Sequence, residues 1–410
     1  MSATRCRFCD AELSHVFADL GVSPLSNAFL HPEQLDLRES FYPLTVYVCA
    51  QCLLVQLPAS ETPENIFGDY AYFSSYSDSW LAHAREYCRA MIARLGLDAG
   101  TQVVEIASND GYLLQYFLEA GIPVLGVEPA ANVAAVAQEK GIETVVRFFG
   151  VETARDLASA GRKATLLLGN NVLAHVPELN DFVAGMKILL DAGGVITMEF
   201  PHLMRLIEGN QFDTIYHEHF SYFSLLAAQK IFLAHGLAIV DVDELPTHGG
   251  SLRIHARHAE ETARPDGRVA ALLEREREFG LDRIETYARF AEQVRKTKRE
   301  LLSFLIRAKA EGKQVAGYGA PAKGNTLLNY CGIRTDFIDY TVDRSPHKQG
   351  LFLPGTRIPV YAPDRIRETK PDFILILPWN LKDEVIGQLA DVRAWGGRFV
   401  VPIPHVEIVE

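Results

Sequence analysis

The sequence predicts an α/β protein made of a small N-terminal module, a central α/β domain and a second α/β domain at the C-terminus. Strand-like apolar runs alternate with helical segments in two separate regions, which is typical of mostly parallel sheets covered by helices. A long charged helical segment separates these regions, and two CxxC pairs lie before the first. The 410 residues also exceed what one core organises. We expect domains over residues 1–68, 69–265 and 266–410.

Composition limits the classes of partner. The net charge of -12 argues against a nucleic-acid partner, and no apolar stretch reaches the roughly 20 residues that span a bilayer. The N-terminus lacks the basic-then-apolar pattern of a signal peptide. We therefore expect a cytoplasmic protein without a membrane partner, working as a monomer.

The two CxxC pairs indicate a metal site. Cys6 and Cys9 form the first pair, and Cys49 and Cys52 form the second. Four thiolates complete a tetrahedral shell that leaves no position for a substrate, so the pattern predicts structural zinc. Two redox dithiols are the open alternative.

The elements follow in order along the chain. Apolar residues at helical spacing predict a helix over residues 79–94. Strands of the central domain are expected at 102–106, 124–127, 144–146, 164–168 and 194–198. One continuous helix is expected over 269–309. Strands of the last domain are expected at 313–320, 337–342, 373–377 and 398–401.

The loop after the first central strand carries acidic residues where a dinucleotide-binding loop carries glycines. It spans Glu105 to Gly111, and its charge suits the cationic amino-acid end of S-adenosylmethionine better than a pyrophosphate. The second strand ends at Glu128, a carboxylate placed to accept hydrogen bonds from ribose hydroxyls. We expect this methyl donor to contact Glu105, Ala107, Asn109, Asp110, Gly111, Glu128 and Pro129.

A third polar loop follows the fourth central strand. Asn170, Asn171 and His175 lie there, at the edge of the sheet where the donor loop also lies. We expect the two asparagines beside the donor, and Asn171 and His175 facing the substrate. A buried structural histidine is the equally favoured alternative for His175.

The densest group of acid-base residues is the segment 216–223, YHEHFSYF. Its two histidines lack the i, i+4 helical spacing of a catalytic metal motif. An aromatic, partly desolvated surround instead favours proton transfer, with Glu218 orienting a partner imidazole. Tyr70 and Tyr72 belong to a second aromatic cluster, which either covers the cleft or packs between domains.

Six segments together resemble a known family. The paired CxxC module, EIASNDGYLL, GVEP, NNVLAHVPELNDF, IYHEHFSYFS and GYGAPAKGNTLLNY occur in this order. They are similar to the sugar C-methyltransferases that act on nucleotide-linked 4-keto-deoxysugars, and the likeness covers essentially the whole chain. It implies a zinc-binding domain, a central S-adenosylmethionine domain and a C-terminal Rossmann-like domain around a dTDP-sugar.

The resemblance also implies roles for individual residues. His219 would be the general base at C3 of the sugar, with Glu218 orienting it and Tyr216 near the sugar. Asn171 and His175 would steady the C4 oxygen, and Tyr70 or Tyr72 would line the cleft.

The substrate's remaining contacts are expected on both α/β domains. The candidates are Glu199, His202, Tyr222, His248, Arg253, Tyr318, Lys323 and Asn325. Lys323 would neutralise pyrophosphate charge. The glycines at 317, 319 and 324 do not match GxGxxG, and no acidic residue follows at a convincing position, so we expect a Rossmann-like domain without a cofactor.

Three other functions stay open. An NAD-dependent nucleotide-sugar oxidoreductase would use one α/β domain, but it needs a glycine-rich phosphate loop that the first strand lacks. A methyltransferase acting on oxygen or nitrogen would keep the donor site. A non-catalytic zinc-module adaptor would keep only the fold.

Overall fold

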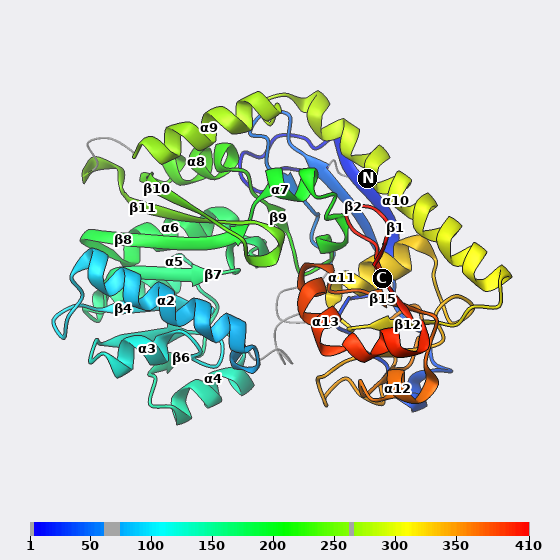
Figure 1. Ribbon diagram of the computed structural model, residues 1–410. Helices are drawn as coiled ribbons and strands as arrows, with labels where there is room; N and C mark the ends of the chain where they lie inside the picture. Colours follow the sequence, from blue (N-terminus) through cyan, green and yellow to red (C-terminus); the bar gives the residue numbers. More distant parts are fainter. Residues whose placement is uncertain (1–3, 61–73, 262–265, 410) are drawn as a thin grey trace.

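The computed structural model describes residues 4–60, 74–261 and 266–409, and it confirms the α/β class with three sheets (Figure 1). Each sheet has its own strand order. The first runs β1-β2-β3-β9, the second β10-β11-β8-β7-β4-β5-β6, and the third β14-β13-β12-β15-β16-β17.

The N-terminal sheet is antiparallel and contains a strand from far along the chain. Its strands are β1 (His15–Ser23), β2 (Tyr42–Val48), β3 (Val55–Gln56) and β9 (Ser221–Tyr222). Strand β9 pairs with β3 and follows directly on the HEH segment. The N-terminal module therefore fixes the position of the segment that carries the acid-base residues.

The central sheet is parallel except at one edge. Its parallel strands are β4 (Val103–Ile106), β5 (Val124–Val127), β6 (Thr144–Val145), β7 (Ala164–Asn170) and β8 (Leu190–Pro201). The antiparallel edge is β11 (Ser251–His258) with β10 (Leu237–Leu245). Every residue of β4 and β5 is buried. Apart from the buried Glu105 of β4, their residues are apolar or glycine, which suits strands that are covered on both faces.

Helices cover both faces of the central sheet. They are α2 (Asp78–Leu95), α3 (Leu114–Glu119), α4 (Ala131–Glu139), α5 (Val151–Ser159), α6 (Leu179–Leu189), α7 (Leu203–Glu208) and α8 (Leu225–Ala234). Helix α2 begins at Ser77, whose side chain accepts a hydrogen bond from the Trp80 amide, and ends at the left-handed Gly96. Both ends are therefore capped by residues that favour these positions.

The C-terminal sheet resembles the central one in layout. Its strands are β12 (Val315–Tyr318), β13 (Thr341–Val342), β14 (Val360–Tyr361), β15 (Phe373–Ile376), β16 (Arg398–Val401) and the antiparallel β17 (Glu407–Val409). Helix α11 (Ala322–Cys331) packs into the hydrophobic core shared with the N-terminal and central sheets. Helices α12 (Arg365–Thr369) and α13 (Lys382–Gln388) pack into a smaller core made by the C-terminal domain itself. The strand order reverses between β12 and β15, where such folds bind ligands.

The single helix expected over 269–309 was wrong. The structure has α9 (Gly267–Phe279) and α10 (Ile284–Ala310), separated at Gly280, which has a φ of 97°. Helix α10 covers the N-terminal sheet, because Phe290 stacks on Phe17 of β1 at 4.5 Å. None of the helices in the described part of the chain is long and apolar enough to cross a membrane.

Candidate active site between the three sheets

The four CxxC cysteines lie together, with their sulfur atoms all within 4.8 Å of one another. Cys6 Sγ is 3.5 Å from Cys52 Sγ, and Cys9 Sγ is 3.5 Å from Cys49 Sγ. Four thiolates at zinc bond lengths of about 2.3 Å are about 3.8 Å apart in a tetrahedron. The cluster therefore fits one zinc ion, which would join the two ends of the module.

The donor loop has a conformation that requires a glycine at one position. After β4, Ala107, Asn109 and Gly111 all have positive φ, at 56°, 50° and 73°. A Cβ on Gly111 would lie 2.4 Å from Ile142 Cδ1, so a side chain there would require at least the end of the Ile142 side chain to move. The close approach of the Gly111 backbone to a ligand stays a prediction.

Three carboxylates gather at this loop. Glu105 and Asp110 are completely buried and Glu128 is 5% exposed. The partly exposed Lys140 lies 3.7 Å from Asp110, whereas both oxygens of Glu105 lack a hydrogen-bond partner among the described residues. Burial, with the charges of Glu128 and Asp110, raises the pKa of Glu105 well above its usual range. Such a group of acids fits a cationic ligand, which would relieve their repulsion.

Glu128 is held by backbone amides. Its two oxygens accept hydrogen bonds from the amides of Asn109, at 2.9 Å, and Ala130, at 3.0 Å. Burial raises its pKa, and these two bonds oppose the rise. The carboxylate is thereby aimed by the donor loop itself, next to Pro129.

The third loop connects the donor side to the acceptor side. The Asn170 side chain donates to the Tyr112 hydroxyl at 3.4 Å, on the donor side. Asn171, with a positive φ of 55°, reaches the other way, to His248 Nε2 at 3.1 Å. Trp80 of α2 stacks on Tyr112 at 6.0 Å and lies 5.4 Å from the His248 ring.

The residues of the HEH segment point to different partners. His217 contacts the Pro43 carbonyl at 3.2 Å and the Tyr42 ring of β2, so it belongs to the contact with the N-terminal sheet. The His219 ring lies 4.0 Å from Tyr216 and 4.7 Å from His175. His217 therefore packs against the N-terminal sheet, whereas His219 lies in a cluster with His175, Tyr216 and Tyr222.

His219 is oriented by a backbone carbonyl. Its Nδ1 lies 2.8 Å from the Thr214 oxygen, a partner that only accepts hydrogen bonds, so Nδ1 carries the proton and Nε2 keeps its lone pair. Burial lowers the pKa of His219 well below its usual value, and the neighbouring His175 lowers it further. The ring is neutral near pH 7.

The backbone of Glu218 hydrogen-bonds to the His175 ring, but the Glu218 carboxylate is not the partner of His219. Its Oε1 accepts a hydrogen bond of 2.6 Å from the side chain of Asn27, and Thr214 holds His219 instead. Burial raises the pKa of Glu218 to about 7, against the opposing effect of the Asn27 bond. The segment thus contains a carboxyl group that titrates near neutrality.

Two expected substrate contacts lie elsewhere. His202 is buried, and its Nε2 lies 2.7 Å from a Glu276 oxygen whose carboxylate also accepts from the amides at the start of α8. Asn325 is buried, and its amide donates to the Ser26 carbonyl at 2.6 Å. Both join separate parts of the chain, and the structure does not bring them together with His219.

Arg253 is not an unpaired cation. It donates to Glu199 at 2.6 Å, contacts His83 at 3.1 Å and lies over the Tyr87 ring at 4.5 Å. The same Glu199 accepts from Thr247 at 3.1 Å, next to His248. These residues form a charge cluster under α2 that supports the loop carrying His248, so a direct phosphate contact by Arg253 is not what the geometry favours.

Lys323 lies at the start of α11, where the C-terminal domain faces the cluster. It donates to Asn380 at 2.8 Å and lies over the Trp379 ring at 4.7 Å. Trp379 in turn donates to Asp213 at 2.7 Å, next to Thr214. Burial lowers the pKa of Lys323, and its charge contributes to lowering the pKa of both His219 and His248.

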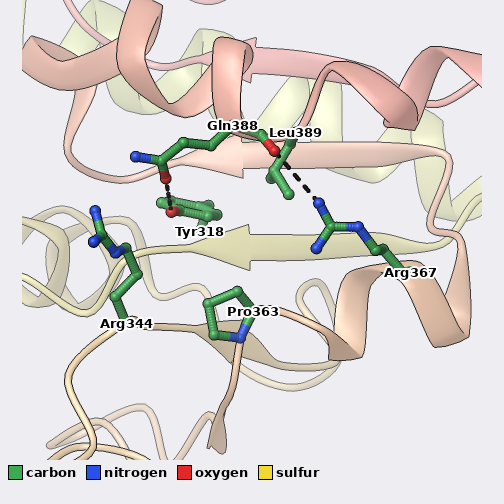
Figure 2. Close-up of a pocket in the computed structure, with 6 residues that line it drawn as sticks. All are labelled: Tyr318, Arg344, Pro363, Arg367, Gln388 and Leu389. Atoms are coloured by element: carbon green, nitrogen blue, oxygen red, sulfur yellow. Dashed lines mark hydrogen bonds between the residues drawn. The ribbon is translucent and has the colours of Figure 1, made fainter.

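Tyr318 lines a separate cavity of about 190 Å³ between α12 and α13 (Figure 2). Its hydroxyl donates to Gln388 at 2.9 Å, and Arg344 and Arg367 lie on either side. The expected absence of a strand-end acid was wrong, because Asp343 directly follows β13. Its carboxylate accepts from the Ala320 amide at 2.7 Å and the Ser345 amide at 2.8 Å, so it braces the glycine loop.

Sequence reasoning missed the residues that hold this site. Asn27, Thr214, Trp80 and His83 belong to no motif, and only their partners across the fold reveal them. Tyr70 and Tyr72 lie outside the described residues. The segment that follows them begins at the donor loop, where the Ser74 amide donates to Asn109 at 2.9 Å.

Comparisons with known proteins agree along the whole chain. Three family models match: "Putative zinc binding domain" over residues 6–67, "Methyltransferase domain" over 80–242, and "C-methyltransferase C-terminal domain" over 246–404. The C-methyltransferase NovU of Streptomyces niveus is 38% identical over 98% of this chain and 96% of its own length.

Other similarities are partial. A ubiquinone biosynthesis O-methyltransferase of Chelativorans sp. is 28% identical over 24% of this chain and 39% of its own length. The solved magnesium protoporphyrin IX methyltransferase of Synechocystis, with bound SAM, is 18% identical with a TM-score of 0.33, covering 47% of this chain and 88% of that one.

Proposed function

This chain belongs to the S-adenosylmethionine-dependent C-methyltransferases, and we propose that it methylates C3 of a nucleotide-linked 4-keto-deoxysugar, carried by dTDP. The observation that carries the proposal is the state of His219. A neutral imidazole that keeps its proton on Nδ1 and its lone pair on Nε2, set among aromatic rings, is suited to removing a proton from carbon.

The acceptor carbon must first become a nucleophile. A C–H bond beside a ketone is acidified because the electrons left behind spread onto the ketone oxygen as an enolate. In our proposal His219 Nε2 takes the C3 proton, and the electron pair left on C3 would form the new bond to the methyl carbon while the bond between that carbon and the donor sulfur breaks and its electron pair stays on sulfur. Tyr216 packs beside the sugar, while Asn171 and His175 steady the C4 oxygen.

The low pKa of His219 has a compensating cause. A weaker base removes a proton less readily, yet Lys323, whose charge adds to the larger effect of burial in lowering that pKa, also makes the site favourable for negative charge on the sugar oxygen. The same electrostatic environment thus disfavours imidazolium in the resting protein and stabilises the enolate.

The donor site supports a cationic cofactor in this reaction. S-adenosylmethionine supplies an electrophilic methyl group on a positively charged sulfur. Glu105 and Asp110 would offset its charge, and Glu128, aimed by two amides, would hold the ribose hydroxyls. Because Asn170 ends β7, Asn171 follows it directly, and the two side chains reach opposite sides, this loop would keep donor and acceptor in register.

The nucleotide would lie along the C-terminal domain. Lys323 would neutralise pyrophosphate charge, and Tyr318 stands at the end of β12, beside the reversal in strand order. The proposal keeps the three domains expected from the sequence, which end at residues 68, 265 and 410.

The test is to incubate the protein with labelled S-adenosylmethionine and a panel of dTDP-4-keto sugars, and to locate the label by mass spectrometry and NMR. We expect label on C3. Label on oxygen or nitrogen would show another methyltransferase, and thermal stabilisation by NAD without stabilisation by S-adenosylhomocysteine would favour the oxidoreductase.

A further inference from the structure

The N-terminal module contributes the side chain that hydrogen-bonds to the carboxylate of the acid-base segment. Asn27 Nδ2 donates to Glu218 Oε1 at 2.6 Å, across 191 positions of sequence. Asn27 is exposed, whereas Glu218 is only 6% exposed, so the asparagine covers the carboxylate from the outer side. A buried carboxylate depends strongly on such donors, because few others replace the water it has lost.

The position of Asn27 is determined by the C-terminal domain. The carbonyl of the preceding Ser26 accepts from the buried Asn325 at 2.6 Å. Three residues after Asn27, Leu30 exchanges two backbone hydrogen bonds of 2.9 Å with Phe352. The loop is thus attached to the C-terminal domain on both sides of Asn27.

We propose that Asn27 is a positioning residue that keeps the Glu218 carboxylate ionised and in place. The loop that carries Asn27 thereby links the N-terminal module and the C-terminal domain to the acid-base segment. The proposal rests on the proposed function for its kinetic consequence, but its structural part does not. Asn325 acts through the same loop, which gives this buried residue a role other than substrate contact.

No ionised side chain among the described residues competes for this role. Among the described residues, burial and the Asn27 bond are the two causes that act on the pKa of Glu218. The nearest imidazoles, His175, His217 and His219, all have pKa values lowered by burial and are neutral near pH 7. The cations Arg7 and Lys323 influence Tyr222 and His219 respectively.

The sign of the expected effect follows from the bond. Asn27 donates to the charged form, so it lowers the pKa of Glu218; removing it raises that pKa and reduces the ionised fraction at pH 7. Hydrogen bonds to charged groups contribute about 1.5–3 kcal/mol, which corresponds to a rise in pKa of about one to two pH units.

The first measurement needs no substrate. The Glu218 carboxyl band is identified by infrared difference spectroscopy as the one lost in Glu218→Gln, and its titration is followed in Asn27→Leu and the nearly isosteric Asn27→Asp. We expect midpoints raised by about one pH unit in the first variant and by more in the second, where a like charge replaces the donor. Unchanged midpoints in both variants would overturn the proposal.

The second measurement follows kcat/KM against pH with the sugar acceptor. The acidic limb moves upward in both Asn27 variants, and activity on that limb falls about tenfold for each pH unit by which the limb moves. Asn180→Leu is the matched control, because Asn180 also joins the N-terminal module to the central domain, through the Phe8 carbonyl at 2.9 Å. Its profile stays in place.

Zinc content and S-adenosylhomocysteine binding are measured in every variant to establish folding. If the wild type methylates no ketosugar, the proposed function fails while the infrared titration still decides the role of Asn27. If the wild type is active and the Asn27 variants have the same pH profile of kcat/KM as the wild type, the proposed role of Asn27 is rejected and the proposed function stands.

Discussion

The donor half and the acceptor half of the site are built in different ways. The donor residues lie on loops that follow neighbouring parallel strands of one sheet, β4, β5 and β7. The acceptor residues depend on all three sheets: Asn27 comes from the N-terminal module, His219 from the central domain and Lys323 from the C-terminal domain. In our proposal a single sheet would therefore bind the donor, whereas the acceptor residues would come together only when the three domains are docked.

Loss of zinc should give the largest difference between the two halves of the site. Without metal the two CxxC turns are no longer joined, and β3, which pairs with β9, loses its support. We expect a chelated protein to lose methyl transfer while it still binds S-adenosylhomocysteine, as measured by calorimetry. Equal loss of methyl transfer and of S-adenosylhomocysteine binding would show that the donor half and the acceptor half depend on zinc to the same extent.

Substitution of His219 should act on the acceptor half alone. His219→Asn removes the Nε2 lone pair, and loss of a general base typically lowers kcat by about 10²–10⁴-fold. Solvent deuterium exchange at the sugar carbon should disappear, with donor affinity retained. The control is His15→Asn, on the exposed start of β1. Exchange at the wild-type rate in His219→Asn would remove this residue from the base role.

Substitution of Glu128 should act on the donor half alone. Glu128→Gln keeps the shape but removes the charge that would accept hydrogen bonds from the ribose, which costs about 1.5–3 kcal/mol, or about 10- to 100-fold in affinity. The Kd for S-adenosylhomocysteine measures this, with the exposed Glu119→Gln as control. We expect weaker binding of S-adenosylhomocysteine and unchanged deuterium exchange at the sugar carbon. Slower exchange at saturating sugar would show that the donor half and the acceptor half do not act independently.

The smallest expected effect concerns stability of the donor loop. Gly111→Ala and Gly121→Ala both place a side chain at positive φ, at 73° and 74°, which costs about 1–2 kcal/mol. Only position 111 also meets a neighbour, Ile142 Cδ1 at 2.4 Å, which adds about 1–3 kcal/mol. We expect a larger fall in Tm for Gly111→Ala. An equal fall would mean that Ile142 moves aside at no cost.

The two halves also differ in how far they could be predicted. Glu105 lies near the end of β4, and Gly111 and Glu128 follow β4 and β5, two strands recognisable from their apolar residues; the strand ends of a parallel sheet place all three at one edge. His202, Arg253 and Asn325 looked equally functional by residue type, but their partners are Glu276, Glu199 and Ser26. A polar residue's partner is decided by packing, which local sequence does not encode.

The sequence by itself determined the α/β class, the four-cysteine cluster, the donor loop and the segment that carries the acid-base groups, because each depends on residues close together in the chain or on the periodicity of strands and helices. Only the tertiary structure decided that Thr214 holds His219, that Asn27 holds Glu218 and that Lys323 faces the cluster. The Thr214 contact is made within one irregular loop, whereas the Asn27 and Lys323 contacts join different domains; all three form because burial leaves each polar group to find its partner among the atoms packed against it.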